Sequence, residues 1–334
     1  MFKQQTSTVT EVSFLPSNPS IALSCSKDGT VCIFDVRSNS CVHAFNESGH
    51  EFCSLSANNS GVVLAAASLN KTFLWDLRTM ATWRTYDDLH TEDLTHIRFH
   101  PAHSHLLCTS SVDGLVNIMD NTKVREEDFI SVTLSVDTSV SKFGFVGAGG
   151  EGMYVTTDIH GVQLWNLTTA DRVCFVDDAR PSMTANISGS GAIEMNYIID
   201  GVFNAASNAT GLFAGSDSGD VMVCSLMPSA AGLQIAQSAF GRSIHSDVVR
   251  CCVWNEAVRV VSNFRFFIWS LYLIDRQTLF TVEAKTAQSQ LHGSRHRSII
   301  VLFPNKNHPI SASAQFCTPV SIKIPKSNVT QRTR

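Results

Sequence analysis

The stretch Thr91–Asp120, TEDLTHIRFHPAHSHLLCTSSVDGLVNIMD, contains three short runs of alternating residues separated by turn residues. Pro101 follows the first run, and Asp113-Gly114 joins the second to the third. Alternation favours strands, and an Asp-Gly pair readily supplies the positive φ of a tight hairpin turn. The stretch therefore predicts an antiparallel β-meander. Its runs lie, in order, at 94–99, 105–111 and 115–120.

The same arrangement recurs before and after this stretch. The third runs of the five readable copies end at Asp35, Asp76, Asp120, Asn166 and Ser225. These ends are spaced by roughly 40 to 60 residues, and a four-stranded repeat unit has about the shorter of these lengths. Further runs such as 41–45 and 82–86 supply a fourth, outer strand. A loop rich in Ser, Gly and Ala, from about 177 to 191, is predicted to lengthen the last interval. The sequence thus predicts an all-β repeat protein.

A sixth copy begins at 249–255 and does not continue, because no Asp-Gly turn or closing third run follows. We therefore divide the chain into a repeat domain, residues 1–257, and a tail, residues 258–334. The tail is predicted to be irregular or disordered, and one hypothesis is that read-through or a misassigned reading frame replaces the rest of the blade. Its aromatic run is interrupted by Arg265 and is too short for a transmembrane helix.

Composition narrows the classes of function. The 25 Lys and Arg residues against 29 Asp and Glu residues give a net charge of −4. A protein that tracks nucleic acid needs a concentrated basic face, so nucleic acid is not the expected partner. The ten cysteines are scattered without a Cys-x-x-Cys pair, so we expect neither a zinc site nor a disulfide framework. No apolar secretory segment follows Met1, and we expect an intracellular location, cytoplasmic or nuclear.

Several short motifs in the sequence resemble the WD40 repeat. They are Trp75-Asp76, its variants Phe34-Asp35, Met119-Asp120 and Trp165-Asn166, and the upstream Gly49-His50. The resemblance implies a WD40 β-propeller, with blades packed around a channel. Longer segments at 93–101, 111–120 and 248–255 resemble the family of WD repeat-containing protein 89. This resemblance implies a propeller of seven blades and no assigned enzymatic activity. The chain starts at that family's second blade and leaves its last blade unfinished, and both departures argue against a closed ring.

His90 precedes a strand by the spacing at which WD40 histidines join an aspartate in the turn and a hydroxyl on the second strand. The resemblance assigns these roles to Asp113 and Ser110, and it adds Trp75 and Asp76 of the repeat signature to the blade network. A buried network of this kind satisfies polar groups and rigidifies a blade. We therefore interpret these residues as structural.

No other pattern indicates chemistry. The histidines at 96, 100, 103 and 105 are close in sequence, but they lie on a strand end and a turn, so a metal site is not expected. The chain has no nucleophile elbow, phosphate loop or dinucleotide fingerprint in the required context. We therefore expect no enzymatic activity and no cofactor.

The predicted function is a non-enzymatic scaffold that binds protein or peptide partners on the propeller rim and at the channel mouth, without a membrane partner. An alternative comes from Phe34-Asp35-Val36-Arg37 and Trp75-Asp76-Leu77-Arg78. Both resemble the WDxR motif by which some WD40 proteins dock on the adaptor of cullin-RING ubiquitin ligases, so Arg37 and Arg78 would make the chain a substrate receptor. The competing interpretation is an arginine that lies over its own blade.

Overall fold

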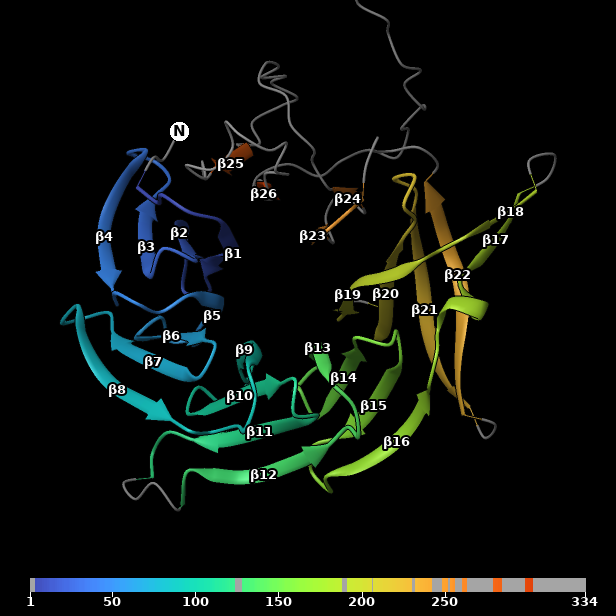
Figure 1. Ribbon diagram of the computed structural model, residues 1–334, viewed down its shortest axis with the longest axis horizontal. Helices are drawn as coiled ribbons and strands as arrows, with labels where there is room; N and C mark the ends of the chain where they lie inside the picture. The colour runs from blue at the N-terminus through green and yellow to red at the C-terminus, as the bar shows by residue number, and fades with distance from the viewer. Residues whose placement is uncertain are drawn as a thin grey trace, which may run out of the picture. The chain divides into compact units, whose positions relative to one another are not determined.

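The computed structural model is built almost entirely of β-strands. It describes residues 4–123, 128–187, 191–205, 207–229, 232–241, 248–251, 253–255, 260–262, 279–283 and 298–302, all within the compact unit of residues 1–304. In this part of the chain, five four-stranded antiparallel sheets follow one another (Figure 1). Within each sheet, strands that are consecutive in sequence are neighbours, which confirms the predicted meander.

The first three sheets span residues 9 to 135. The first contains β1 (Val9–Leu15), β2 (Asn18–Ser26), β3 (Thr30–Asp35) and β4 (Ser40–Asn46). The second contains β5 (Phe52–Ala57), β6 (Val63–Ser68), β7 (Lys71–Asp76) and β8 (Ala81–Asp87). The third contains β9 (Leu94–Phe99), β10 (Leu106–Ser111), β11 (Leu115–Asp120) and β12 (Ile130–Ser135).

The remaining two large sheets span residues 140 to 241. The fourth contains β13 (Val140–Val146), β14 (Gly152–Thr157), β15 (Val162–Asn166) and β16 (Asp171–Val176). The fifth contains β19 (Tyr197–Asn204), β20 (Ala209–Gly215), β21 (Val221–Ser229) and β22 (Gly232–Gly241).

The predicted Asp-Gly turns are present. Gly29 and Gly114 have φ values of 82° and 80°, in the left-handed region where side chains are disfavoured. A Cβ atom at Gly114 would also lie 3.1 Å from the carbonyl oxygen of Thr138. Glycine therefore fits both the turn and its close neighbour.

The acidic or amide residue that ends the third strand closes the next turn. Its side-chain oxygen accepts a hydrogen bond from the backbone N–H two residues later, at 2.8 to 2.9 Å. This local bond is the physical reason why Asp or Asn recurs at the end of the repeat. The four residues that do this are Asp35, Asp76, Asp120 and Asn166.

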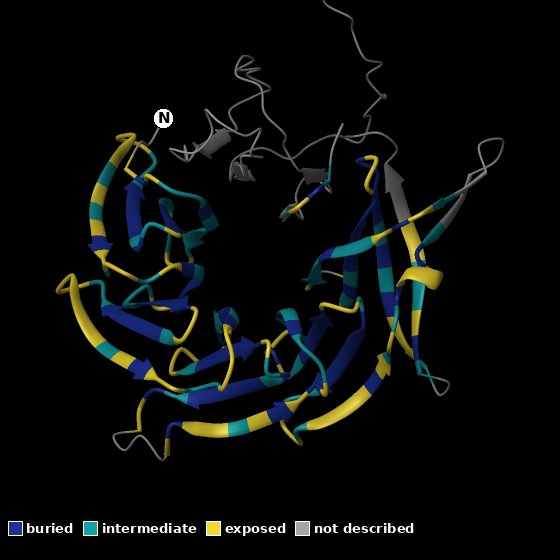
Figure 2. Ribbon diagram, in the orientation of Figure 1, coloured by how far each residue is buried: buried dark blue, intermediate teal, exposed yellow. Residues whose placement is uncertain are grey.

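The hydrophobic core lies between consecutive sheets. One cluster joins Leu23 and Ile33 of the first sheet to Leu55 and Trp75 of the second, and similar clusters fill each later interface. The second and third strands are mostly buried, whereas the fourth strands of the first four sheets are mostly exposed or intermediate (Figure 2). In these four sheets, the second and third strands thus form the buried part and the fourth strand faces solvent.

The predicted loop at 177–191 is wrong in part. It contains a 3-10 helix, η2 (Arg180–Ser182), and the strand β17 (Thr184–Ile187), which pairs with β18 (Gly191–Glu194). Ile193 of β18 packs against the core cluster between the fourth and fifth sheets. Small residues concealed this hairpin because they resemble linker composition.

The sixth copy and the tail are described only in part. β23 (Val253–Asn255) pairs with β24 (Val260–Ser262), and β25 (Leu279–Glu283) pairs with β26 (Ser298–Leu302). Three of these strands lie within the predicted tail, residues 258–334. The rest of that tail, and the reading-frame hypothesis attached to it, lies outside the described residues.

Candidate functional site

The structure brings His90 and Asp113 together in the third sheet. The Nδ1 atom of His90 lies 3.0 Å from Oδ2 of Asp113, and its Nε2 atom lies 3.0 Å from the hydroxyl of Thr109. Asp113 also accepts hydrogen bonds from the backbone N–H groups of Thr91 and Leu115, at 3.1 and 2.9 Å. Burial lowers the pKa of His90 although a carboxylate faces it. This network ties the connection before β9 to the β10–β11 turn.

Ser110, the hydroxyl predicted for this network, belongs elsewhere. Its Oγ atom lies 2.9 Å from Oγ1 of Thr95, whereas the adjacent Thr109 faces His90. Consecutive side chains of a strand point to opposite faces, so only one of these two hydroxyls can reach the histidine. The prediction was wrong by one residue because the sequence does not show which face of β10 is turned toward His90.

Trp75 and Asp76 lie in the second sheet and take no part in the His90 network. Trp75 is fully buried, and its ring stacks on Phe45 and Phe73 with centroids 4.8 and 5.9 Å apart. Its indole N–H finds no acceptor among the described residues. Trp75 therefore stabilises the interface between the first two sheets by packing.

Arg37 and Arg78 occupy equivalent turns in consecutive sheets. Arg37 lies 3.3 Å from the Asp35 carboxylate and Arg78 lies 2.6 Å from the Asp76 carboxylate. Hydrogen bonds from Arg78 lower the pKa of Asp76 to about 2. The two arginine side chains are 72% and 71% exposed. Each guanidinium is thus paired within its own turn and is also accessible to a partner.

The first strands of the five sheets, β1, β5, β9, β13 and β19, share one irregularity. In each, the pairing with the second strand shifts by one residue near the start, as in a β-bulge. A bulge re-aims the side chains beside it. The residue directly after the shift is polar in every sheet: Glu11, Ser54, His96, Lys142 and Asp200.

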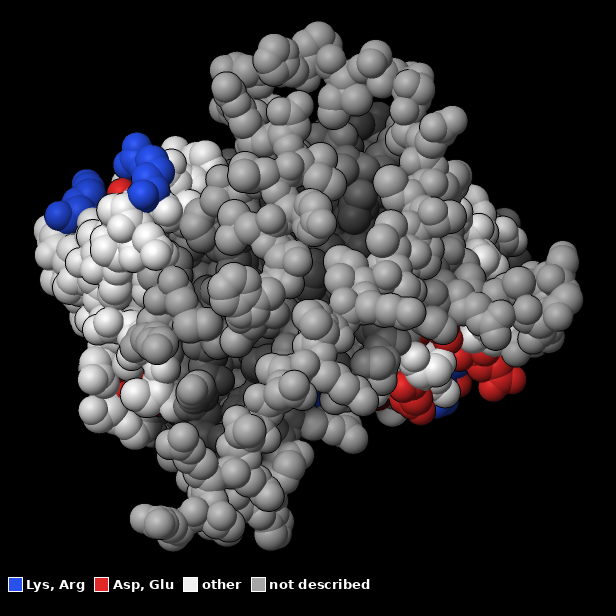
Figure 3. Space-filling view, turned by 90° about the horizontal axis from the view of Figure 1, so that it is seen from above, with Lys and Arg blue, Asp and Glu red and all other residues white. Residues whose placement is uncertain are grey.

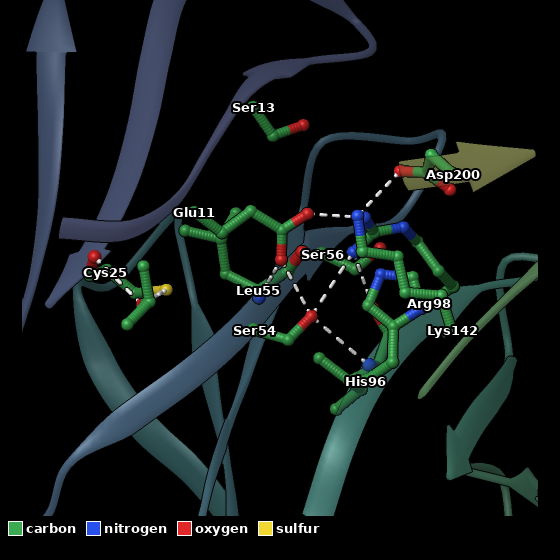
Figure 4. Close-up of polar contacts among 12 residues, drawn as sticks. Glu11, Ser13, Cys25, Ser54, Leu55, Ser56, His96, Arg98, Lys142 and Asp200 are labelled. Atoms are coloured by element: carbon green, nitrogen blue, oxygen red, sulfur yellow. Dashed lines mark hydrogen bonds and ion pairs between the residues drawn. The ribbon is translucent and has the colours of Figure 1, made fainter. Parts of the chain in front are cut away.

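The first four of these polar side chains bond to the first strand of the next sheet (Figure 4). In the first three sheets, the side chain accepts a hydrogen bond from a backbone N–H of the neighbouring strand. The donor and acceptor pairs are Leu55 N–H to Glu11 at 2.9 Å, Ile97 N–H to Ser54 at 3.2 Å and Phe143 N–H to His96 at 3.4 Å. Burial lowers the pKa of His96 well below its usual value, which keeps its ring nitrogen available as an acceptor.

An ion pair between Glu11 and Arg98 joins the first sheet to the third. Arg98 also donates to the carbonyl oxygen of Leu55, at 2.9 Å, so it contacts all three sheets. Burial opposes the charged guanidinium, but Glu11 and Asp200 together raise the pKa of Arg98. Since a lone charge here would lack compensation, the pair acts as a unit.

Lys142 continues the series with a different bond, because an ammonium group has no acceptor to offer. It donates to the Asp200 carboxylate at 3.0 Å and to the carbonyl oxygen of Ile199 at 2.9 Å. Tyr154 reaches the same strand and donates to the carbonyl oxygen of Gly201 at 2.7 Å. A Cβ atom at Gly201 would lie 2.4 Å from the Tyr154 ring, so glycine makes room for it.

We call Glu11, Ser54, His96, Arg98, Lys142 and Asp200 the inner cluster. Ser54 donates to Glu11 at 2.7 Å, which resembles a nucleophile beside a base. However, Arg98 is paired with that carboxylate, and a general base must be free to take the proton. Within the described residues, no group of three or more His, Cys, Asp or Glu side chains is placed to hold a metal ion. The hydrogen bonds and ion pairs of the inner cluster join consecutive sheets to one another.

Sequence reasoning missed the inner cluster. Within a single copy, a polar residue near the start of the first run looks like a residue on the solvent-facing side of a strand. The available signal was its recurrence: in the first four copies a polar residue stands two positions after the first strongly apolar one. Its neighbour in the next sheet is about 45 residues away along the chain, and alternation within a run does not reveal such partners.

Two observations concern the surface. Among the described residues, no helix is long and apolar enough to cross a membrane. On the face in Figure 3, described Lys and Arg side chains gather in one group and Asp and Glu side chains in another, with no continuous basic surface over the described part.

Comparison with known proteins identifies the repeat. The family model described as "WD domain, G-beta repeat" matches residues 1–35 and 84–120. A WD40 propeller in the "Crystal Structure of Mitotic Checkpoint Complex" superimposes with a TM-score of 0.60 at 16% identity, covering 77% of this chain and 73% of that one. At this identity the likeness shows the fold alone.

Two curated relatives have similar sequences. The "WD repeat-containing protein 89 homolog" of Dictyostelium discoideum is 29% identical over 74% of this chain and 66% of its own length. The "WD repeat-containing protein GTS1" of Arabidopsis thaliana is 29% identical over 49% of this chain and 43% of its own length. The chain thus spans less than two thirds of the length of these relatives.

Proposed function

The chain is a WD40-repeat protein with a β-propeller fold, and from this premise we propose that it is a non-enzymatic scaffold that binds protein partners. Repeated folds of this kind carry their function on loops held by a rigid frame. One observation carries the proposal: in the described residues, the charges of the inner cluster bond the sheets to one another. The residues that remain exposed for recognition are those at the turns and connections and on the outer strands.

Lysine-directed cross-linking of the tagged full chain in cells, followed by mass spectrometry, tests this function. Lys27 and Lys71 lie beside turns at one end of their sheets, and Lys123 lies in a turn at the opposite end. We expect proteins enriched over a tag-only control and cross-linked to these lysines. If the folded chain enriches no protein, the scaffold proposal is wrong.

Docking on a cullin-RING adaptor is a second proposal, and the repeated, exposed Asp–Arg units at Arg37 and Arg78 favour it. A pull-down with the adaptor compares the full chain with an Arg37→Ala, Arg78→Ala variant. Arg172→Ala is the matched control, because that arginine is also paired with an aspartate but lies outside the motif. We expect only the double variant to lose binding, and retained binding would end this alternative.

We also propose an intracellular location, cytoplasmic or nuclear. All eight cysteines in the described part of the chain are free thiols, a state that reducing compartments maintain. Fractionation of cells that express the tagged chain tests this. Recovery from the secreted fraction would contradict it.

A further inference from the structure

Three exposed apolar side chains lie at the same end of three consecutive sheets. Leu69, Val112 and Ile159 occupy the turns between the second and third strands of the second, third and fourth sheets, and they are 41%, 44% and 57% exposed. In an antiparallel sheet, this turn lies at the same end as the connection that leaves the fourth strand. The inner-cluster bonds join equivalent positions of the first strands, so these ends are aligned from sheet to sheet.

The connection from β8 to β9, residues 88–93, lies between the first two of these turns. The backbone N–H of Leu94 donates to the carbonyl oxygen of Leu69 at 2.7 Å, and that of Val112 donates to the carbonyl oxygen of Asp93 at 3.0 Å. Both apolar residues therefore border one short segment. The two apolar side chains and this connection form a continuous stretch of surface.

Three carboxylates on this connection have no counter-charge among the residues that the structure describes. Asp88, Glu92 and Asp93 are exposed, and none of them forms an ion pair with a residue that the structure describes. The adjacent Asp87, in contrast, is paired with a cation, since its carboxylate lies 3.1 Å from the ammonium group of Lys71. At the opposite end of the sheets, Arg37 and Arg78 are paired with the carboxylates of Asp35 and Asp76. Carboxylates without a counter-charge among the described residues therefore distinguish the β8–β9 connection from those two turns.

The His90–Asp113 network holds this connection in place. Asp113 accepts the backbone N–H of Thr91, and the hydroxyl of Ser111 donates to the carbonyl oxygen of Glu92 at 3.0 Å. A loop fixed before binding loses less conformational entropy when a partner docks. The carboxylates are therefore presented on an ordered backbone.

We propose that Leu69, Val112, Asp88, Glu92 and Asp93, the turn face, dock a basic segment of a protein partner in which Lys or Arg residues alternate with apolar ones. This inference rests on the proposed scaffold function and names the partner's chemistry. Apolar residues of the segment pack on Leu69 and Val112, and its cations pair with the carboxylates between them. Charge complementarity of this kind sets partner choice and makes binding sensitive to salt.

Fluorescence anisotropy with a labelled synthetic peptide of alternating Lys and Leu residues tests the turn face of the full chain. The triple variant Asp88→Asn, Glu92→Gln, Asp93→Asn is expected to weaken binding roughly tenfold. Leu69→Ser with Val112→Ser should weaken it as well. The matched control removes the same three charges from the opposite end, by Asp128→Asn, Glu151→Gln and Asp171→Asn, and should leave binding unchanged.

The proposal is overturned if both triple variants weaken binding equally, or if a peptide with Glu in place of Lys binds as tightly. Circular dichroism confirms that each variant is folded. Failure here is distinguishable from failure of the scaffold function. Partners cross-linked only near Lys123 would leave the scaffold standing and place recognition at the other end.

Discussion

At the scale of single residues, the Asp113 carboxylate accepts hydrogen bonds from three donors. Its removal should therefore leave all three donors without this acceptor. We predict that Asp113→Ala lowers the free energy of unfolding by about 1–3 kcal/mol, because the buried imidazole of His90 and the partly buried N–H of Leu115 lose their acceptor. Asp113→Asn keeps one acceptor oxygen and should lose less. Thermal unfolding measures both, and an unchanged melting temperature for Asp113→Ala would count against a structural role.

Glu11 and Arg98 lie 87 residues apart in sequence and form one unit in the fold. A double-mutant cycle with Glu11→Gln and Arg98→Met should show a coupling free energy of about 0.5–3 kcal/mol in denaturant unfolding. The exposed pair Lys27–Glu51, at 2.8 Å, is the control and should couple by less than about 1 kcal/mol. Strict additivity of Glu11 and Arg98 would contradict their pairing.

At the scale of elements, the turns between third and fourth strands contain residues with positive φ. Asn39, Met80 and Ala170 have φ values of 54°, 52° and 58° at equivalent positions. Asparagine tolerates this conformation, but a side chain such as that of alanine is strained there. Ala170→Gly should therefore stabilise the chain by about 0.5–1 kcal/mol in thermal unfolding. Ala81→Gly, in β8, should destabilise it, and a loss of stability in Ala170→Gly would refute the strain.

Most strands of the described sheets could be predicted because alternation and Asp-Gly turns are local signals. The β17–β18 hairpin was not predicted because its small residues are typical of a linker. The choice of Ser110 over Thr109 failed because strand register relative to His90 is a tertiary property. The inner cluster could not be predicted from any one copy, since Lys142 and Asp200 meet only when two sheets pack.

At the scale of the whole molecule, buried imidazoles make stability depend on pH. Burial lowers the pKa values of His90, His96 and His100 in the folded chain. Unfolded histidines take up a proton near pH 6.5. Their contribution to stability is therefore present above about pH 6.5 and is lost as the pH falls toward the folded pKa values. We expect the melting temperature to fall between about pH 7.5 and 5.5, and His96→Gln to reduce that dependence. An equal slope in the variant would exclude His96 as a source.

The central claim is that side chains of the inner strands bond consecutive sheets into the frame that carries the exposed turns. Amide hydrogen exchange on the folded full chain tests it most directly, at the backbone N–H groups of Leu55, Ile97 and Phe143. We predict that these three amides exchange as slowly as those of the buried strand β6, and that Ser54→Ala selectively accelerates Ile97. Exchange at all three as fast as at the exposed turn residue Asn70 would contradict the account.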